Sequence, residues 1–159
     1  MNAAGLQEVK KELTELSQKE LVELCLALAK YKKDNKEYLG FLLFEAHDKP
    51  GFIKEVKSGI DTHFEELIKQ TNLYYVKKGL RKQLRLLTKY SKYVGDKALT
   101  ADMLIYFLQK LKRSGIPYHK NKLIVNLYAQ QLKKINALVN SFHEDLQADY
   151  RNDLEELTE

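Results

Sequence analysis

Hydrophobic residues recur at intervals of three and four along almost the whole chain, which is the spacing of one face of an amphipathic α-helix. Gly and Pro are scarce, and the pattern pauses where they occur. The sharpest pause is Asp48-Lys49-Pro50-Gly51. The spacing therefore predicts helices over about 6–16, 18–32, 34–47, 51–70, 73–94 and 100–113, and a long helical stretch after Pro117.

Capping boxes, in which a polar side chain and a carboxylate three residues later satisfy free backbone amides, mark several helix starts. Three pairs fit the box at expected helix starts, Ser17 with Glu20, Asp34 with Glu37, and Ser141 with Glu144, and Thr62 with Glu65 matches it inside an expected helix. The third pair lies within the 42 residues after Pro117, which contain neither Gly nor Pro. We therefore expect that stretch to break near Asn140–Ser141 into two helices.

The predicted fold class is all-α, with seven or eight antiparallel amphipathic helices in one domain over residues 1–159. The helices group into three pairs, over residues 18–47, 51–94 and 97–140. Such pairs are compatible with a short solenoid-like stack of the HEAT type or with a closed helical bundle. Residues 144–159 form an acidic C-terminal helix or tail. The apolar faces predict these buried residues: Leu21, Leu24, Cys25, Leu28, Leu42, Phe64, Leu84, Leu87, Leu104, Phe107, Leu108, Leu127 and Leu138.

The run Glu20-Leu21-Val22-Glu23-Leu24 after its Ser cap, closed by Tyr31-Lys32-Lys33, resembles small bacterial all-helical families of unknown function. The basic segment around Leu80-Arg81-Lys82 resembles them too. The resemblance covers most of the chain and implies a helical fold. It implies no activity, substrate or site residue.

Charge is unevenly distributed along the 159 residues, whose net charge is +5. Residues 144–159 hold seven acids and one base, so the remaining 143 residues carry a net charge of +11.

The single cysteine, Cys25, cannot form an intramolecular disulfide, and we interpret it as a small core residue. The chain begins without a secretory signal pattern and has no apolar run long enough to insert into a membrane, so we expect a cytoplasmic protein.

Motifs of common catalytic and cofactor sites are missing. The seven glycines are isolated, so no phosphate-binding loop is present, and one cysteine cannot build a zinc finger. We expect no enzyme, cofactor or metal. We interpret His63 as a packed, hydrogen-bonded histidine. His143 lies near Asp145, Asp149 and Asp153 in the sequence, and we interpret this group as a solvated helix face, with a binding site for a hard cation as the alternative. One alternative remains: the protein is an enzyme or a metal-binding bundle, and its site is not visible in the sequence.

The segment from Leu67 to Gly95 contains no acid. At about 100° per residue, six of its cations share an arc of about 100°, opposite the apolar side chains, and Tyr74 projects within that arc. The candidate site residues are Tyr74, Lys78, Arg81, Lys82, Arg85, Lys89 and Lys92. Neighbouring like charges repel by a few tenths of a kcal/mol per pair, a cost that an anionic partner would offset.

This basic face predicts a non-enzymatic binding or scaffold module for an anionic macromolecule, either an acidic protein or a nucleic acid whose bases stack on tyrosine. A solvated face, and a face neutralised by the acidic tail of the same or a second copy, are the alternatives. A homo-oligomer is therefore possible. A second basic run can extend the same surface: Lys110, Lys112, Arg113, His119, Lys120 and Lys122.

Overall fold

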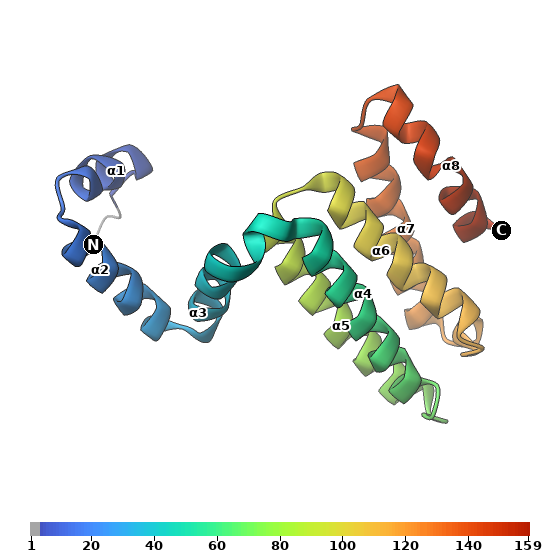
Figure 1. The fold of residues 1–159 in the computed structure, drawn as a ribbon. Helices are drawn as coiled ribbons and strands as arrows, with labels where there is room; N and C mark the ends of the chain where they lie inside the picture. The colour runs from blue at the N-terminus through green and yellow to red at the C-terminus, as the bar shows by residue number, and fades with distance from the viewer. Residues whose placement is uncertain (1–3) are drawn as a thin grey trace. The chain divides into compact units, whose positions relative to one another are not determined.

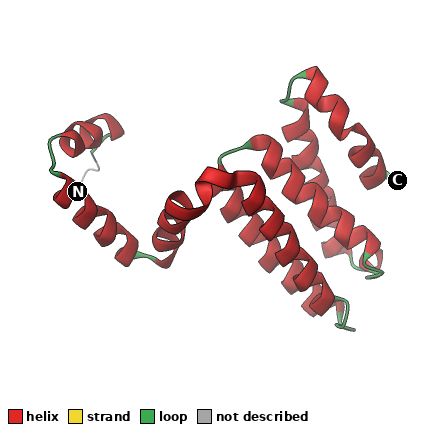
Figure 2. Cartoon of the chain, in the orientation of Figure 1, coloured by secondary structure: helices red, strands yellow, loops and turns green. Residues whose placement is uncertain are grey.

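The computed structural model describes residues 4–159, which contain α-helices and short helical turns but no strand (Figures 1 and 2). The all-α prediction is therefore confirmed. The chain divides into two compact units, one ending at Glu45 and one over Ala46–Glu159, and each is described by itself. That residues 1–159 form a single domain stays a prediction.

The N-terminal unit contains α1 (Leu6–Thr14), α2 (Gln18–Tyr31) and α3 (Lys33–Gly40), and α3 continues as a π-helical segment, Phe41–Glu45. The capping box at Ser17 is confirmed, because Ser17 Oγ accepts from Glu20 N at 3.3 Å and the Ser17 amide donates to Glu20 at 2.8 Å. The box at Asp34 is wrong, since α3 already begins at Lys33 and its N-cap, Lys32, makes no side-chain cap.

The C-terminal unit begins with a short 3₁₀ turn, Ala46–Asp48. Its helices are α4 (Lys49–Leu67), α5 (Leu73–Val94), α6 (Lys97–Arg113), α7 (Lys122–Asn140) and α8 (Glu144–Thr158), with a 3₁₀ turn, Tyr118–Lys120, before α7. α5 matches its predicted range. α6 begins three residues earlier than Thr100, because Asp96 accepts from the Leu99 amide at 3.0 Å and caps the helix there. The predicted break after Asn140 is confirmed, but His143 rather than Ser141 precedes α8.

The helices of the C-terminal unit form two layers, with α4, α6 and α8 in one layer and α5 and α7 in the other (Figure 1). Extensive contacts join each helix only to helices one or two places away in the chain, and α6 packs against all four others. Among the described helices, α4 and α8 make no extensive contact that would close a ring. Within this unit the layers are open, as in a solenoid-like stack, and the architecture of residues 1–159 as a whole stays a prediction.

The hydrophobic core lies around α6, whose buried side chains include Met103, Leu104, Phe107, Leu108 and Leu111. Phe107 packs edge-on against Phe64 of α4, with ring centroids 5.7 Å apart. Burial is confirmed for these predicted core residues: Phe64, Leu87, Leu104, Phe107, Leu108 and Leu127.

The burial predictions for the N-terminal unit are wrong. Leu21 is half-buried, while Leu24, Cys25, Leu28 and Leu42 are exposed. Three short helices offer few surfaces to pack against, and Phe41 is the only buried side chain among residues 4–45. In the C-terminal unit, Leu84 and Leu138 are half-buried rather than buried, because both lie at the edges of their helices' core-facing sides.

Candidate functional site

α5 has a sharply defined start and end, which keep its basic face in one continuous helix. At its start, Asn72 Oδ1 accepts from the Tyr74 amide at 2.9 Å. At its end, Gly95 adopts φ 61°, a left-handed conformation that suits glycine and stops the helix. The 22 residues between them extend over about 33 Å.

The core-facing side of α5 is formed by Val76, Leu80, Gln83, Leu87 and Val94, all of which are buried. The predicted basic residues occupy the opposite side of the helix. Tyr74, Lys78, Arg81, Lys82, Arg85 and Lys92 are exposed, and Lys89 is half-buried. The structure therefore places all seven candidate residues on one solvent-facing side of α5.

Most of these cations lack an acidic neighbour. Within residues 4–159, no carboxylate lies within ion-pair distance of Lys78, Arg81, Lys82, Arg85 or Lys92. None of these five cations therefore forms an ion pair with a described residue.

Two tyrosines extend the basic face at the start of α5. Tyr74 and Tyr75 are 56% and 55% exposed, and their rings meet edge to face with centroids 5.3 Å apart. Lys77 Nζ lies 5.0 Å from the centre of the Tyr74 ring. The sequence pattern selected Tyr74 but not Tyr75, and the structure leaves more than half of each side chain exposed, although Lys77 lies over the Tyr74 ring.

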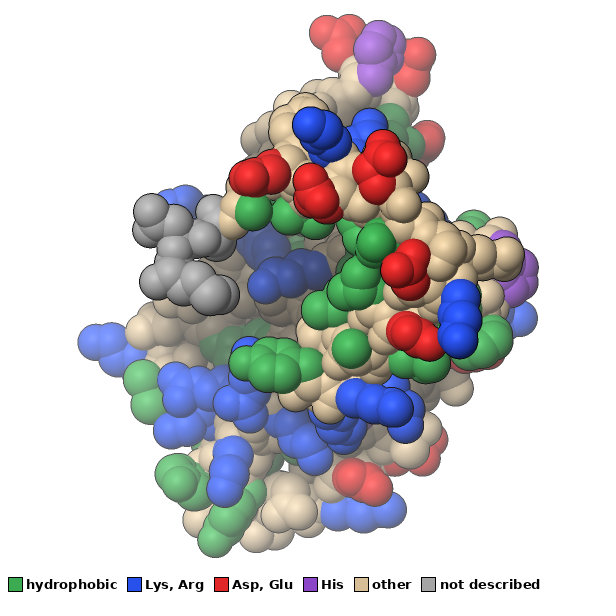
Figure 3. Space-filling view, turned by 90° about the vertical axis from the view of Figure 1, so that its left-hand side faces the viewer, with side chains coloured by type: hydrophobic (Ala, Val, Ile, Leu, Met, Phe, Trp, Pro, Cys, Tyr) green, Lys and Arg blue, Asp and Glu red, His purple; other side chains and the backbone are tan. Residues whose placement is uncertain are grey.

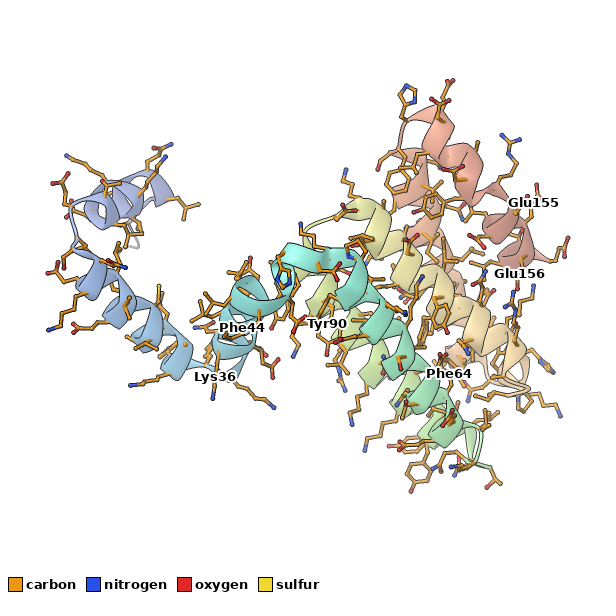
Figure 4. The ribbon with its side chains drawn as sticks, viewed as in Figure 1. Lys36, Phe44, Phe64, Tyr90, Glu155 and Glu156 are labelled. Carbon is orange, nitrogen blue, oxygen red and sulfur yellow. The ribbon has the colours of Figure 1, made fainter. Side chains whose placement is uncertain are left out.

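The acidic helix α8 packs on α6 and α7, not on the basic face of α5. Arg113 Nε donates to Glu156 at 2.9 Å, and Gln109 Nε2 donates to Asp153 at 2.9 Å. Glu156 is labelled near the end of α8 in Figure 4. Lys112 also donates to the Glu156 carbonyl oxygen. Part of the second basic run is thereby engaged with α8, while His119, Lys120 and Lys122 are exposed.

Two tyrosines, the buried Tyr150 and the half-buried Tyr128, complete the docking of α8. Tyr150 donates to Asp102 Oδ1 at 2.7 Å, and burial with this hydrogen bond raises the Tyr150 pKa. Tyr128 of α7 donates to the Leu157 carbonyl oxygen at 2.9 Å, and burial raises the Tyr128 pKa to about 12. These contacts explain why an acidic segment forms an ordered helix here rather than a tail.

A pocket of about 340 Å³ between α4 and α6 brings three ionisable groups together. Lys110 Nζ lies 2.6 Å from Asp61 Oδ1, and Tyr106 Oη donates to Asp61 at 2.8 Å. Partial burial alone would raise the Asp61 pKa, but the hydrogen bonds from Lys110 and Tyr106 outweigh it and hold that pKa below its ordinary value. The hydrogen bond to Asp61 raises the Lys110 pKa, and burial raises the Tyr106 pKa.

These shifts hold Asp61 ionised, and Lys110 and Tyr106 protonated, at neutral pH. The hydrogen bond and the ion pair made by Asp61 cross-link α4 to α6. Sequence reasoning missed the trio, because Asp61 and Tyr106 are 45 residues apart and no local pattern joins them.

Of the four histidines, His63 is packed against a neighbouring helix, and His47, His119 and His143 are exposed. His63 Nε2 donates to the Gly79 carbonyl oxygen at 3.0 Å, as expected of a packed, hydrogen-bonded histidine. His143 Nδ1 lies 3.6 Å from Asp145, and both side chains are exposed. Across the described part of the chain, no three His, Cys, Asp or Glu side chains converge in a way that would hold a metal ion.

None of the helices within residues 4–159 combines the length and the apolar character needed to cross a membrane. Comparison of the chain with protein-family models, with curated proteins and with solved structures finds no match.

Proposed function

We propose that the chain is a non-enzymatic helical binding module that contacts an anionic macromolecule through the basic face of α5. The observation that carries the proposal is a row of five exposed cations that form no ion pair with a described residue, opposite the buried face of the same helix: Lys78, Arg81, Lys82, Arg85 and Lys92. Folding alone does not reward this arrangement, since each neighbouring pair of like charges costs a few tenths of a kcal/mol. A polyanion offsets that cost and gains from release of its counterions.

Nucleic acid is the form of polyanion that the tyrosines favour. A phosphate backbone suits a row of Lys and Arg side chains about 33 Å long. Exposed aromatic rings beside the row provide surfaces on which unpaired bases stack, worth about 1–3 kcal/mol per base. An acidic protein would use the same cations but gains less from two adjacent exposed tyrosines.

The test is a fluorescence-anisotropy titration with short single- and double-stranded oligonucleotides at low salt. The logarithm of affinity should fall linearly with the logarithm of salt concentration, with a slope of roughly −4 to −5 for six phosphate contacts. Absence of binding to both oligonucleotides at tens of micromolar protein would reject nucleic acid as the partner.

The double variant Arg81→Glu with Arg85→Glu should remove most of the binding. Its matched control is Lys133→Glu with Lys134→Glu, two exposed lysines of α7 whose reversal changes the net charge equally. Equal loss in both variants would show that net charge, rather than the α5 face, governs binding. Circular dichroism should show the same helix content in both.

A further inference from the structure

One polar side chain lies on the core-facing side of α5 without a hydrogen-bond partner. Gln83 is 6% exposed, and its side-chain amide makes no hydrogen bond to a described residue. Buried amides are nearly always hydrogen-bonded, because leaving one unpaired is costly. Among the described residues, no side-chain nitrogen or oxygen is both completely enclosed and unpartnered, so the Gln83 amide keeps an opening to its surroundings.

That opening is a pocket of about 290 Å³ between α4 and α5, here called the α4–α5 pocket. The residues that line it include Phe52, Glu55 and Gly59 of α4, and Gln83, Leu86 and Tyr90 of α5. Gly59 leaves it roomy, since a Cβ there would meet nothing within 4 Å. Sites for drug-sized ligands have volumes of about 300–1,000 Å³, so the α4–α5 pocket suits one small group.

The walls of the α4–α5 pocket combine aromatic rings with polar groups. The rings of Phe52 and Tyr90 meet edge to face with centroids 5.4 Å apart, and Tyr90 is labelled in Figure 4. Gln83 offers both a hydrogen-bond donor and an acceptor, and the exposed Glu55 offers carboxylate oxygens that form no ion pair with a described residue. A planar heterocycle with hydrogen-bonding groups on its edge matches both kinds of wall.

The α4–α5 pocket borders the basic face of α5. Lys82 precedes the lining residue Leu86 by four positions and Lys89 follows it by three, which makes both lysines its neighbours on the helix surface. Lys89 Nζ also lies 6.0 Å from the centre of the Tyr90 ring. A nucleotide whose phosphate contacts these lysines can therefore turn its base toward the pocket.

Cations beside hydrophobic side chains do not by themselves define a site. Figure 3, which looks at the molecule from the side that lies to the left in Figure 1, shows Lys or Arg and hydrophobic side chains next to one another at the surface. Gln83 distinguishes the α4–α5 pocket, because a bound ligand would satisfy its buried amide.

We propose that the α4–α5 pocket binds one unpaired base of a single-stranded nucleic acid, a base with an exocyclic amino group. The amino group donates to Glu55, and Gln83 pairs with the edge of the ring, as Gln and carboxylate side chains do with adenine and cytosine. Thymine and uracil have no amino group to offer Glu55. The proposal rests on the proposed function, because it specifies which nucleic acid the basic face of α5 selects.

Fluorescence-anisotropy titrations of the full chain test this selection with single strands of deoxyadenosine, deoxycytidine or thymidine, each about 12 nucleotides long. The three strands carry equal numbers of phosphates, so the basic face of α5 alone does not distinguish them. We expect the adenine and cytosine strands to bind about fivefold more tightly than the thymine strand, or better. Equal affinities would overturn the pocket proposal and leave the proposed function standing.

Three variants alter the α4–α5 pocket in different ways. Gln83→Leu removes the amide, Glu55→Ala removes the carboxylate, and Gly59→Leu fills the open space. Each should lower the ratio of adenine-strand to thymine-strand affinity by about fivefold, while continued binding of the thymine strand shows that the basic face is intact.

Glu66→Ala is the matched control for Glu55→Ala. Glu66 is an exposed glutamate of α4 that does not line the α4–α5 pocket, so its removal changes the net charge equally and should keep the ratio of affinities. An unchanged ratio in Gln83→Leu and Gly59→Leu would overturn the proposal, whatever the absolute affinities.

Nuclear magnetic resonance of the isotope-labelled full chain observes the α4–α5 pocket without a polymer. We expect adenosine monophosphate at millimolar concentration to shift the signals of the Gln83 side-chain amide, and uridine monophosphate to shift them clearly less. If no oligonucleotide binds but adenosine monophosphate shifts these signals, the proposed function fails while the base site stands. No shift with adenosine monophosphate would overturn the base site, whether or not the oligonucleotides bind.

Discussion

At Gly79 the backbone of α5 approaches α4 so closely that a side chain has no room. A Cβ there would lie 2.4 Å from Leu67 Cδ2 and 3.5 Å from His63 Nε2. Leu67 is buried and can yield little space, and the Gly79 carbonyl oxygen accepts the His63 hydrogen bond. This glycine sets the distance between the two helices.

Gly79→Ala should therefore lower the free energy of unfolding, by about 1–3 kcal/mol for overpacking, despite the better helix propensity of Ala. Gly59→Ala in α4 is the control, because its Cβ meets nothing within 4 Å. That change should stabilise the protein by about 0.5–1 kcal/mol. Urea unfolding measures both, and a stabilising Gly79→Ala would contradict the close approach.

Asp61 links α4 to α6 only while it is ionised. Because its folded-state pKa lies below the ordinary value, its contribution to stability is complete at neutral pH and is lost as pH falls through that lowered pKa. Asp61→Asn should cost about 1 kcal/mol at pH 7, since the pair with Lys110 is more than a third exposed. The difference from the unmodified chain should shrink below about pH 4.

Urea unfolding of Asp61→Asn and the unmodified chain at several pH values provides the measurement. Tyr106→Phe removes one donor and keeps the ion pair, so its effect should be the smaller of the two. A difference independent of pH would mean that Asp61 contributes through packing rather than through its charge.

At the scale of the element, α5 is turned slightly from the orientation that its apolar pattern predicts. Gln83 is 6% exposed and faces the core, while Leu84 is half-buried at the edge. The pattern selects Leu84 because leucine is more hydrophobic than glutamine. Packing against both α4 and α6 decides which residues lie at the centre of the contact.

Leu87→Ala should thus destabilise the protein by about 2–5 kcal/mol, because Leu87 is fully buried. Leu84→Ala should cost clearly less, about 1–2 kcal/mol, because its site is open to solvent on one side. Denaturant unfolding of the two variants compares them directly. A larger loss for Leu84→Ala would mean that the helix presents the other edge to the core.

At the scale of the whole molecule, the two ends of the chain differ in what they contribute to stability. The unit ending at Glu45 buries one side chain among its described residues, whereas α8 buries Tyr150 and Leu157 against the central helices. The core around α6 lies wholly within the second unit.

A chain comprising residues 46–159 should therefore unfold cooperatively at nearly the same urea midpoint as the full chain. A chain ending before Glu144 should lose about 3–6 kcal/mol, the value of two large buried side chains. Circular dichroism during urea titration follows both. Loss of cooperativity in residues 46–159 would instead support a single domain over 1–159.

The sequence by itself determined the helical class, most helix boundaries and the basic face of α5. These features are local: the three-to-four spacing, a cap or a glycine, and an acid-free interval act within one helix. The helical rotation of about 100° per residue predicted which cations share a face, and the structure places them on that face, all exposed except the half-buried Lys89.

Only the tertiary structure decided what the local pattern leaves open. Periodicity shows which face of a helix is apolar but not whether another helix covers that face. Leu24 and Leu28 were therefore predicted to lie in the core, but both are exposed. The Asp61–Tyr106–Lys110 trio and the docking of α8 on α6 join residues more than 40 positions apart. Such contacts depend on how helices stack, because packing joins faces that no sequence spacing connects.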